Sequence, residues 1–125
     1  MEEKMSAVTE SILDSEKKLL NIDKDYDVFD DDLILHINSI FGTLHQLGVG
    51  PDPQFTISDS SAVWDDYTTD GTVIHEVKTY MFLKLRLLFD PPSSSFVLNS
   101  YEKQIQELEW RLTVKTDEIK GTEDE

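Results

Sequence analysis

An acidic run, Asp23-x-Asp25-x-Asp27, is the first place in this sequence where residue types and spacing match a binding site. Alternating carboxylates open the loops that bind calcium, because hard cations prefer oxygen ligands. Such a loop needs glycine at its sixth position and glutamate at its twelfth, where this chain has Val28 and Ile34. We therefore interpret the run as a solvated acidic loop that precedes a helix.

Histidines and glycines match a catalytic or metal site no better. None of His36, His45 and His75 lies in a His-Glu-x-x-His pattern, and no two share a helix face at a spacing of four residues. The run Gly48-Val-Gly50-Pro lacks the lysine and the following helix of a phosphate-binding loop. No pair of carboxylates stands in an apolar setting typical of a general acid and base. We expect a protein that binds and assembles, with no enzymatic activity, metal or cofactor.

Acidic residues dominate the composition. The 125 residues carry a net charge of −15, and only 38% of them are hydrophobic. Phosphate repels such a chain, which argues against ordinary DNA binding. The low apolar content indicates one small domain whose core neighbouring subunits help to complete. There is no cysteine for a disulfide or a thiolate site, no signal peptide is expected, and no run approaches the ~20 apolar residues that span a bilayer. We expect a soluble intracellular product.

Apolar residues at helical spacing predict four helices, over residues 6–20, 30–48, 72–89 and 93–114. Polar residues suited to N-capping stand at the four starts: Ser6, Asp30 or Asp31, Asp70 or Thr72, and the triplet Ser93 to Ser95. The third helix is apolar almost all round in its second half, so we place it at the centre, with Leu85 and Leu88 buried. The predicted fold is all-α, a small four-helix bundle.

The fourth predicted helix has one continuous apolar seam, formed by Leu98, Tyr101, Ile105, Leu108 and Leu112. Trp110 lies roughly 200° around the helix from Leu108, so the seam cannot bury it. We expect an intermolecular contact for this indole. Beyond Val114 the chain turns polar, which predicts a single domain over residues 1–114 and an acidic, mobile tail over 115–125.

A long irregular loop, residues 48–70, joins the second and third predicted helices. Phe55 to Ile57 is expected to be a short extended piece, and residues 62–67 a helical turn. Connections of this length are uncommon in compact domains and are usually functional. Trp64, within the loop, has two interpretations. It packs over the end of the bundle, or it anchors in a partner's pocket, where tryptophan is often a hot spot.

Four stretches of the sequence carry a family resemblance when they are considered together. They are Asn38-Ser-Ile-Phe-Gly-Thr-Leu-His-Gln-Leu-Gly-Val-Gly-Pro51, Trp64-Asp-Asp-Tyr67, Leu87-Leu-Phe-Asp-Pro-Pro-Ser-Ser-Ser-Phe-Val-Leu98 and Glu107-Leu-Glu-Trp-Arg-Leu112. The pattern resembles the small head-tail connector (adaptor) proteins of long-tailed bacteriophages, over residues 6–114. The stretch from Leu87 to Leu98 is its most specific part.

The resemblance implies a homo-oligomeric ring of α-helical subunits, usually twelvefold. The ring docks beneath the portal protein after the genome is packaged and extends the DNA channel toward a stopper or tail-completion protein. The resemblance also implies a place in the virion, at the neck between head and tail, after synthesis in the host bacterial cytoplasm. DNA would pass through the channel without specific binding, and no membrane would be involved.

Two groups of residues are the candidate sites. We expect a subunit or portal interface formed by Trp110, Arg111, Thr113, Val114, Phe55, Trp64 and Tyr67. We expect an acidic channel or surface formed by Asp23, Asp25, Asp27, Asp65 and Asp66. The alternative function is a small acidic DNA mimic that inhibits a host DNA-binding protein. A mimic would stay a monomer or dimer, whereas a connector would form rings or join a portal.

Overall fold

Five helices make up the secondary structure of the part of the chain that the structure describes. A computed structural model describes residues 10–68 and 70–124, with side chains up to residue 117. The helices are α2 (Ile12–Leu19), α3 (Asp30–Gln46), α4 (Trp64–Tyr67), α5 (Gly71–Phe89) and α6 (Ser95–Asp124). Within the described ranges the only extended pairing is an isolated bridge between Ser11 and Val63. The all-α prediction is confirmed.

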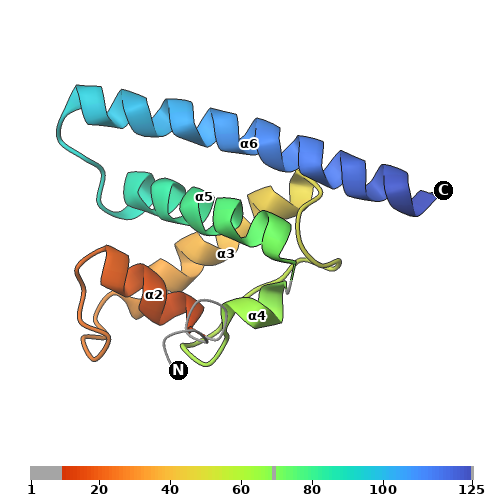
Figure 1. Cartoon of the computed structure of the whole chain (residues 1–125). Helices are drawn as coiled ribbons and strands as arrows, with labels where there is room; N and C mark the ends of the chain where they lie inside the picture. The colour runs from red at the N-terminus through yellow and green to blue at the C-terminus, as the bar shows by residue number, and fades with distance from the viewer. Residues whose placement is uncertain (1–9, 69, 125) are drawn as a thin grey trace, which may run out of the picture.

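Helix α5 occupies the middle of the molecule, as its sequence predicts. It packs against α3 on one side and α6 on the other (Figure 1). Leu85 is fully buried, but Leu88 is 50% exposed, so the expectation for Leu88 is wrong. Leu88 lies in the last turn of α5, where half of its surface remains accessible to solvent.

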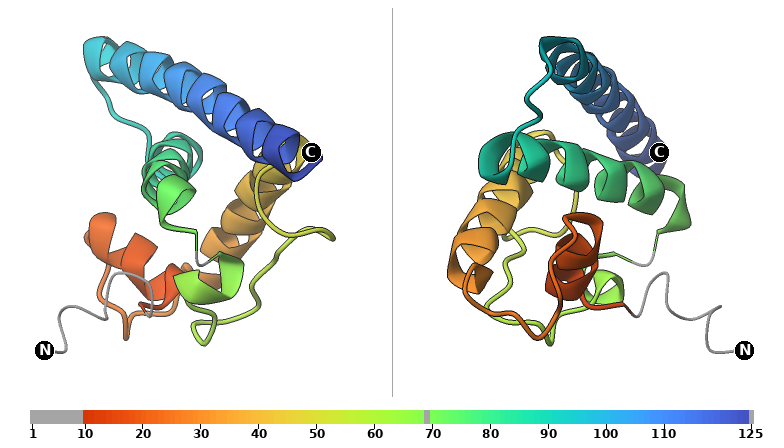
Figure 2. Two further views of the ribbon diagram at one scale, coloured as in Figure 1. Left: turned by 45° about the vertical axis from the view of Figure 1, so that its right-hand side comes forward. Right: turned by 90° about the vertical axis from the view of Figure 1, so that its left-hand side faces the viewer.

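The helices are stacked rather than grouped around one axis, so the expected four-helix bundle is not confirmed. Two further views show α6 on one side of α5, with α2 and α3 on the other (Figure 2). This arrangement follows from the sequence of α5. Because α5 is apolar around most of its circumference, it needs cover from two sides.

Local capping explains where α2 and α5 begin. The Ser11 hydroxyl accepts a hydrogen bond from the Asp14 amide at 3.1 Å, so α2 starts at Ile12. The expected cap, Ser6, lies outside the described residues. Asp70 accepts a hydrogen bond from the Thr72 amide at 2.9 Å, as expected for α5. Hydrogen bonds from Thr72 hold the pKa of Asp70 below its usual value.

Helix α6 is longer than the sequence indicated. We expected it to end near Val114, but it continues without a break to Asp124. The Lys115 ammonium donates to the Thr72 carbonyl at 2.7 Å and pairs with Glu76 at 2.9 Å, and Thr116 is buried. These contacts with α5 hold the start of the expected tail in the helix.

The side chain of Asn38 makes two of the hydrogen bonds that join the long connection between α3 and α5 to α3. Asn38 donates to the Ile57 carbonyl at 2.9 Å and accepts from the Ile57 amide at 2.8 Å. The amide group of Asn38 therefore pairs with the loop as a neighbouring strand would. The loop is held against the helix, with Ile57 buried.

Candidate interaction surface

The outward side of α6 carries a row of residues that the chain itself leaves partly or fully uncovered. We call this row the outer stripe; it consists of Phe96, Ser100, Lys103, Glu107, Trp110 and Val114. Phe96 is 81% exposed and Trp110 66% exposed, the two largest exposures among the aromatic side chains described. Large apolar side chains left in water on one helix face are typical of a surface that binds another protein.

The seam of α6 explains why these residues face outward. Ile105, Leu108 and Leu112 are buried against the rest of the chain, as their spacing predicts. Trp110 lies roughly 200° from Leu108 around the helix, so it points to the opposite side. The expected exposure of Trp110 is therefore present in the structure.

The side chains next to Trp110 differ in their solvent exposure and in the bonds that they already form. Arg111 is exposed and forms an ion pair with Glu107 one turn earlier. Val114 and Thr113 are half-buried, and the Thr113 hydroxyl donates to the Glu109 carbonyl of its own helix at 2.8 Å. Trp110 and Arg111 are thus accessible to solvent and Val114 partly so, while the Thr113 hydroxyl is already bonded.

The aromatic residues of the long loop lie inside the chain. Trp64 is 0% exposed and Tyr67 5% exposed, and half-buried Phe55 packs on Tyr67 with ring centroids 5.5 Å apart. The Trp64 indole nitrogen donates to the Ser15 hydroxyl at 3.2 Å. Trp64 and Tyr67 belong to the core of the folded chain, which is the first of the two interpretations of Trp64. They present no free surface to a partner.

The five candidate acidic residues are all exposed but fall into two separate groups. Asp23, Asp25 and Asp27 lie in the loop after α2. Asp65 and Asp66 lie on α4, beside the start of α2, where Ser11 pairs with Val63. The groups therefore sit at opposite ends of α2. Nowhere in the described residues do three histidine or carboxylate side chains gather in a way that could hold a metal ion.

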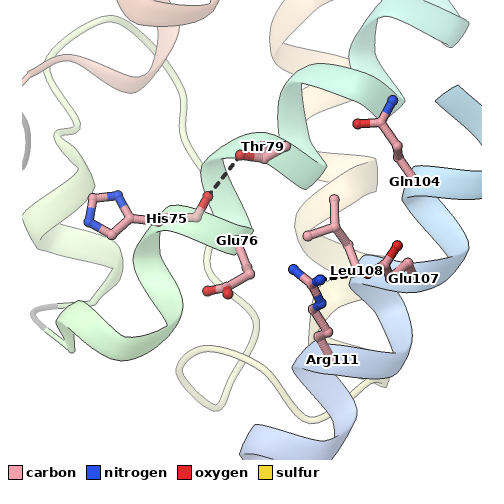
Figure 3. A pocket seen from close by; sticks show the side chains of 7 residues that line it. All are labelled: His75, Glu76, Thr79, Gln104, Glu107, Leu108 and Arg111. Carbon is pink, nitrogen blue, oxygen red and sulfur yellow. Dashed lines mark hydrogen bonds and ion pairs between the residues drawn. The ribbon is translucent and has the colours of Figure 1, made fainter. Parts of the chain in front are cut away.

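An open groove of about 390 Å³ runs between α5 and α6 (Figure 3). Its lining is polar except for one leucine: His75, Glu76, Thr79, Gln104, Glu107, Leu108 and Arg111. Figure 3 shows Arg111 and Glu107 directed toward each other, while His75 points away from α6. The Thr79 hydroxyl donates to the His75 carbonyl at 3.1 Å. Sequence spacing did not reveal the groove, because its residues come from two helices.

Buried ionisable residues are a second feature that the sequence did not reveal. Glu16 is 1% exposed, and burial raises the pKa of its carboxyl to about 8, with a further increase from Glu10 and an opposing effect of Lys78. Burial also raises the pKa of Tyr67. The pKa of Tyr80 is raised by burial and by the hydrogen bond that its hydroxyl donates to Glu109 at 2.8 Å. Glu16 and Lys17 are adjacent in α2, where helical spacing alone gives no sign that both are buried.

Comparison of the chain with known protein families finds a match. A family model described as "Phage connector protein" matches residues 12–119. No curated protein and no solved structure matches the chain significantly. In the described part of the chain, no helix is long and apolar enough to cross a membrane. The matched range contains α2, α3, α4 and α5 and most of α6, and the chain belongs to the phage connector protein family.

Proposed function

We propose that this protein is a head-tail connector (adaptor) subunit that docks as a ring under the portal protein after DNA packaging. The ring extends the DNA channel toward the stopper or tail-completion protein, at the neck of the virion. The observation that carries the proposal is the match of residues 12–119 to the phage connector family. A connector must touch other head or tail proteins, so it needs surfaces that a lone subunit leaves open.

The end of the outer stripe is the best candidate for such a surface. Trp110 is 66% exposed, and Arg111 and Val114 lie beside it on α6. Tryptophan and arginine are among the residues most enriched at energetically important interface positions. We assign this part of α6 to contacts with the next subunit or with the portal.

A ring of such subunits would be held by contacts of one repeated kind. Each subunit would present one surface to the neighbour ahead and a different surface to the neighbour behind. Such head-to-tail contacts close into a ring when the rotation between subunits closes, and we propose twelve subunits.

The acidic composition would make the wall of the channel electrostatically repulsive to DNA. With a net charge of −15 per subunit, a ring would repel the DNA backbone rather than hold it. The exposed carboxylates of Asp23, Asp25 and Asp27, or of Asp65 and Asp66, are candidates for the channel wall or the adjoining surface. DNA would then leave the head without being slowed by tight contacts to the wall.

The decisive experiment mixes the purified protein with the portal protein of the same phage and images the mixture by electron cryo-microscopy. We expect a ring of added density beneath the portal, with repeated helical subunits around an open channel. A folded protein that leaves the portal bare at saturating concentration would overturn the proposal.

The acidic charge also favours one other candidate, a DNA mimic that blocks a host DNA-binding protein. A mimic would bind such a protein in competition with duplex DNA and would ignore the portal. The same mixture therefore separates the two functions. An inhibitor outcome would be a complex with a host DNA-binding protein that added DNA dissociates, and no portal complex.

A further inference from the structure

We propose that the free protein forms a two-fold dimer in which the outer stripes of two α6 helices pack antiparallel. The first support is the spacing of the stripe. From Phe96 to Val114 its residues follow one another at intervals of four, three, four, three and four. This order is the same in both directions, and it is the spacing at which two helices pack side by side.

The antiparallel register places residues of opposite charge, and apolar residues, opposite each other. With the two-fold axis midway between Lys103 and Glu107, each Lys103 faces Glu107 of the second copy, and each Phe96 faces Val114. Glu107 is half-exposed and would join Lys103 while it keeps its ion pair with Arg111 of its own helix. A parallel pair would place Lys103 against Lys103 and Glu107 against Glu107. Facing like charges destabilise a helix pair, and antiparallel helix dipoles attract, so both effects select the antiparallel register.

The same register gives Trp110 a place to bind. Trp110 meets Ser100 of the second copy, the smallest residue of the stripe. Ser100 lines an open groove of about 420 Å³ on α6, together with Phe96, Asn99, Lys103, Gln104 and Glu107. The groove is therefore next to the residue that the exposed indole would reach. An indole is large and apolar, so covering it removes unfavourable contact with water.

The position of α6 leaves the outer stripe accessible. Helix α6 lies at the edge of the molecule, with α5 on its inner side (Figure 2). The stripe extends for roughly 27 Å, from the rise of 1.5 Å per residue. One helix face buries less than the roughly 800 Å² per partner of a standard interface, so we expect a dissociation constant of micromolar order.

A two-fold contact of this kind is distinct from the ring. In a cyclic ring every contact joins two different surfaces, whereas the α6 pair joins a surface to itself. The dimer is thus a state of the free protein that covers Trp110 until a portal or a neighbouring subunit replaces the second copy. Dimer formation is measured without the portal protein, and ring formation is measured with it. Either proposal can therefore be contradicted while the other holds.

Sedimentation equilibrium of the full-length protein without portal tests the pairing. Physiological ionic strength limits the range of charge repulsion between subunits to about 8 Å, so it is the suitable condition. We expect reversible dimers at micromolar concentration. A monomer throughout that range would overturn the proposal.

Charge exchange tests the register. Lys103→Glu and Glu107→Lys each place like charges opposite each other twice in the dimer, and we expect each to weaken dimerisation at least tenfold. The double exchange restores both opposite-charge pairs and should return dimerisation close to that of the unchanged protein. Glu102→Lys, exposed on another side of the same helix, is the matched control and should leave dimerisation intact.

Three results would contradict the antiparallel pair. They are single exchanges without effect, a double exchange that stays as weak as the singles, and a control that weakens dimerisation equally. Circular dichroism of every variant confirms that α6 remains folded. The chain has no cysteine, so a Lys103→Cys copy mixed with a Glu107→Cys copy gives a second test. Oxidation should join the two different copies in preference to two identical ones.

Discussion

The ammonium group of Lys17 lies 2.8 Å from the carboxylate of Asp30, although the side chain of Lys17 is only 1% exposed. The same ammonium donates a hydrogen bond to the Lys24 carbonyl at 2.9 Å. One buried cation thus joins the end of α2, the acidic loop and the start of α3. This cation therefore holds the acidic loop against both helices.

Replacing Lys17 with methionine should destabilise the protein. Lys17→Met keeps most of the side-chain volume but leaves Asp30, which is 27% exposed, without its partner. We expect the free energy of unfolding to fall by about 2–3 kcal/mol in urea titrations, less than for a fully buried pair. Lys18→Met, at an exposed neighbouring position, is the control and should change it by less than about 0.5 kcal/mol. Equal effects of the two substitutions would show that the ion pair adds no stability.

Glu16 should make stability depend on pH. Unfolded Glu16 loses its proton near pH 4.5, whereas folded Glu16 keeps it up to about pH 8. Between these values the folded state binds more protons, so the free energy of unfolding should fall as pH rises through this window. Glu16→Gln stays neutral and should remove a decline on the order of 5 kcal/mol, measured by urea unfolding across the window. The exposed control Glu102→Gln should retain the decline; a Glu16→Gln profile as steep as the parent's would refute the assignment.

Two leucines of α5 should respond differently to truncation. Leu85 is fully buried and Leu88 is 50% exposed. Leu85→Ala leaves a cavity and should cost about 2–5 kcal/mol, whereas Leu88→Ala should cost less than about 1 kcal/mol. Thermal unfolding followed by circular dichroism measures both. If Leu88→Ala costs as much as Leu85→Ala, the end of α5 is more deeply packed than the structure shows.

Two glycines form a similar contrast. Gly50 has φ of +93°, and an added Cβ would lie 2.6 Å from the Tyr67 hydroxyl, so Gly50→Ala should cost about 1–3 kcal/mol. Gly71, the first residue of α5, has open space around it. There alanine should be neutral or stabilise the protein by up to about 1 kcal/mol. Melting temperatures of the two variants should therefore move apart, and a shared direction would contradict the close contact between Gly50 and Tyr67.

Trp110 should matter for assembly and not for folding. Trp110→Ala removes an indole that is 66% exposed, so the melting temperature should stay near the parent's. Docking to the portal, or closure of the ring, should weaken by about 2 kcal/mol or more, as measured by titration of portal with each variant. Leu35→Ala removes an equally exposed apolar side chain from α3 and is the control. An unfolded Trp110→Ala variant would place Trp110 in the core, and normal assembly would remove this surface from the interface.

Features that depend on neighbouring residues along the chain could be predicted from the amino-acid sequence. The Asp70 cap of α5, the end of α5 before Pro91 and the buried seam of α6 follow from spacing and local chemistry. The outward direction of Trp110 follows from the same helical geometry. These features can be predicted without knowing which helices pack against each other.

Which helix faces are covered depends on contacts between distant parts of the chain. Trp64 is buried between Ser15 of α2 and Phe41 of α3. Helix α6 runs past Val114 where Lys115 contacts Thr72, a residue 43 positions earlier. The burial of Lys17 and the exposure of Leu88 likewise depend on where distant segments end. Helical periodicity is a property of a few consecutive residues, whereas burial depends on contacts between residues far apart in the chain.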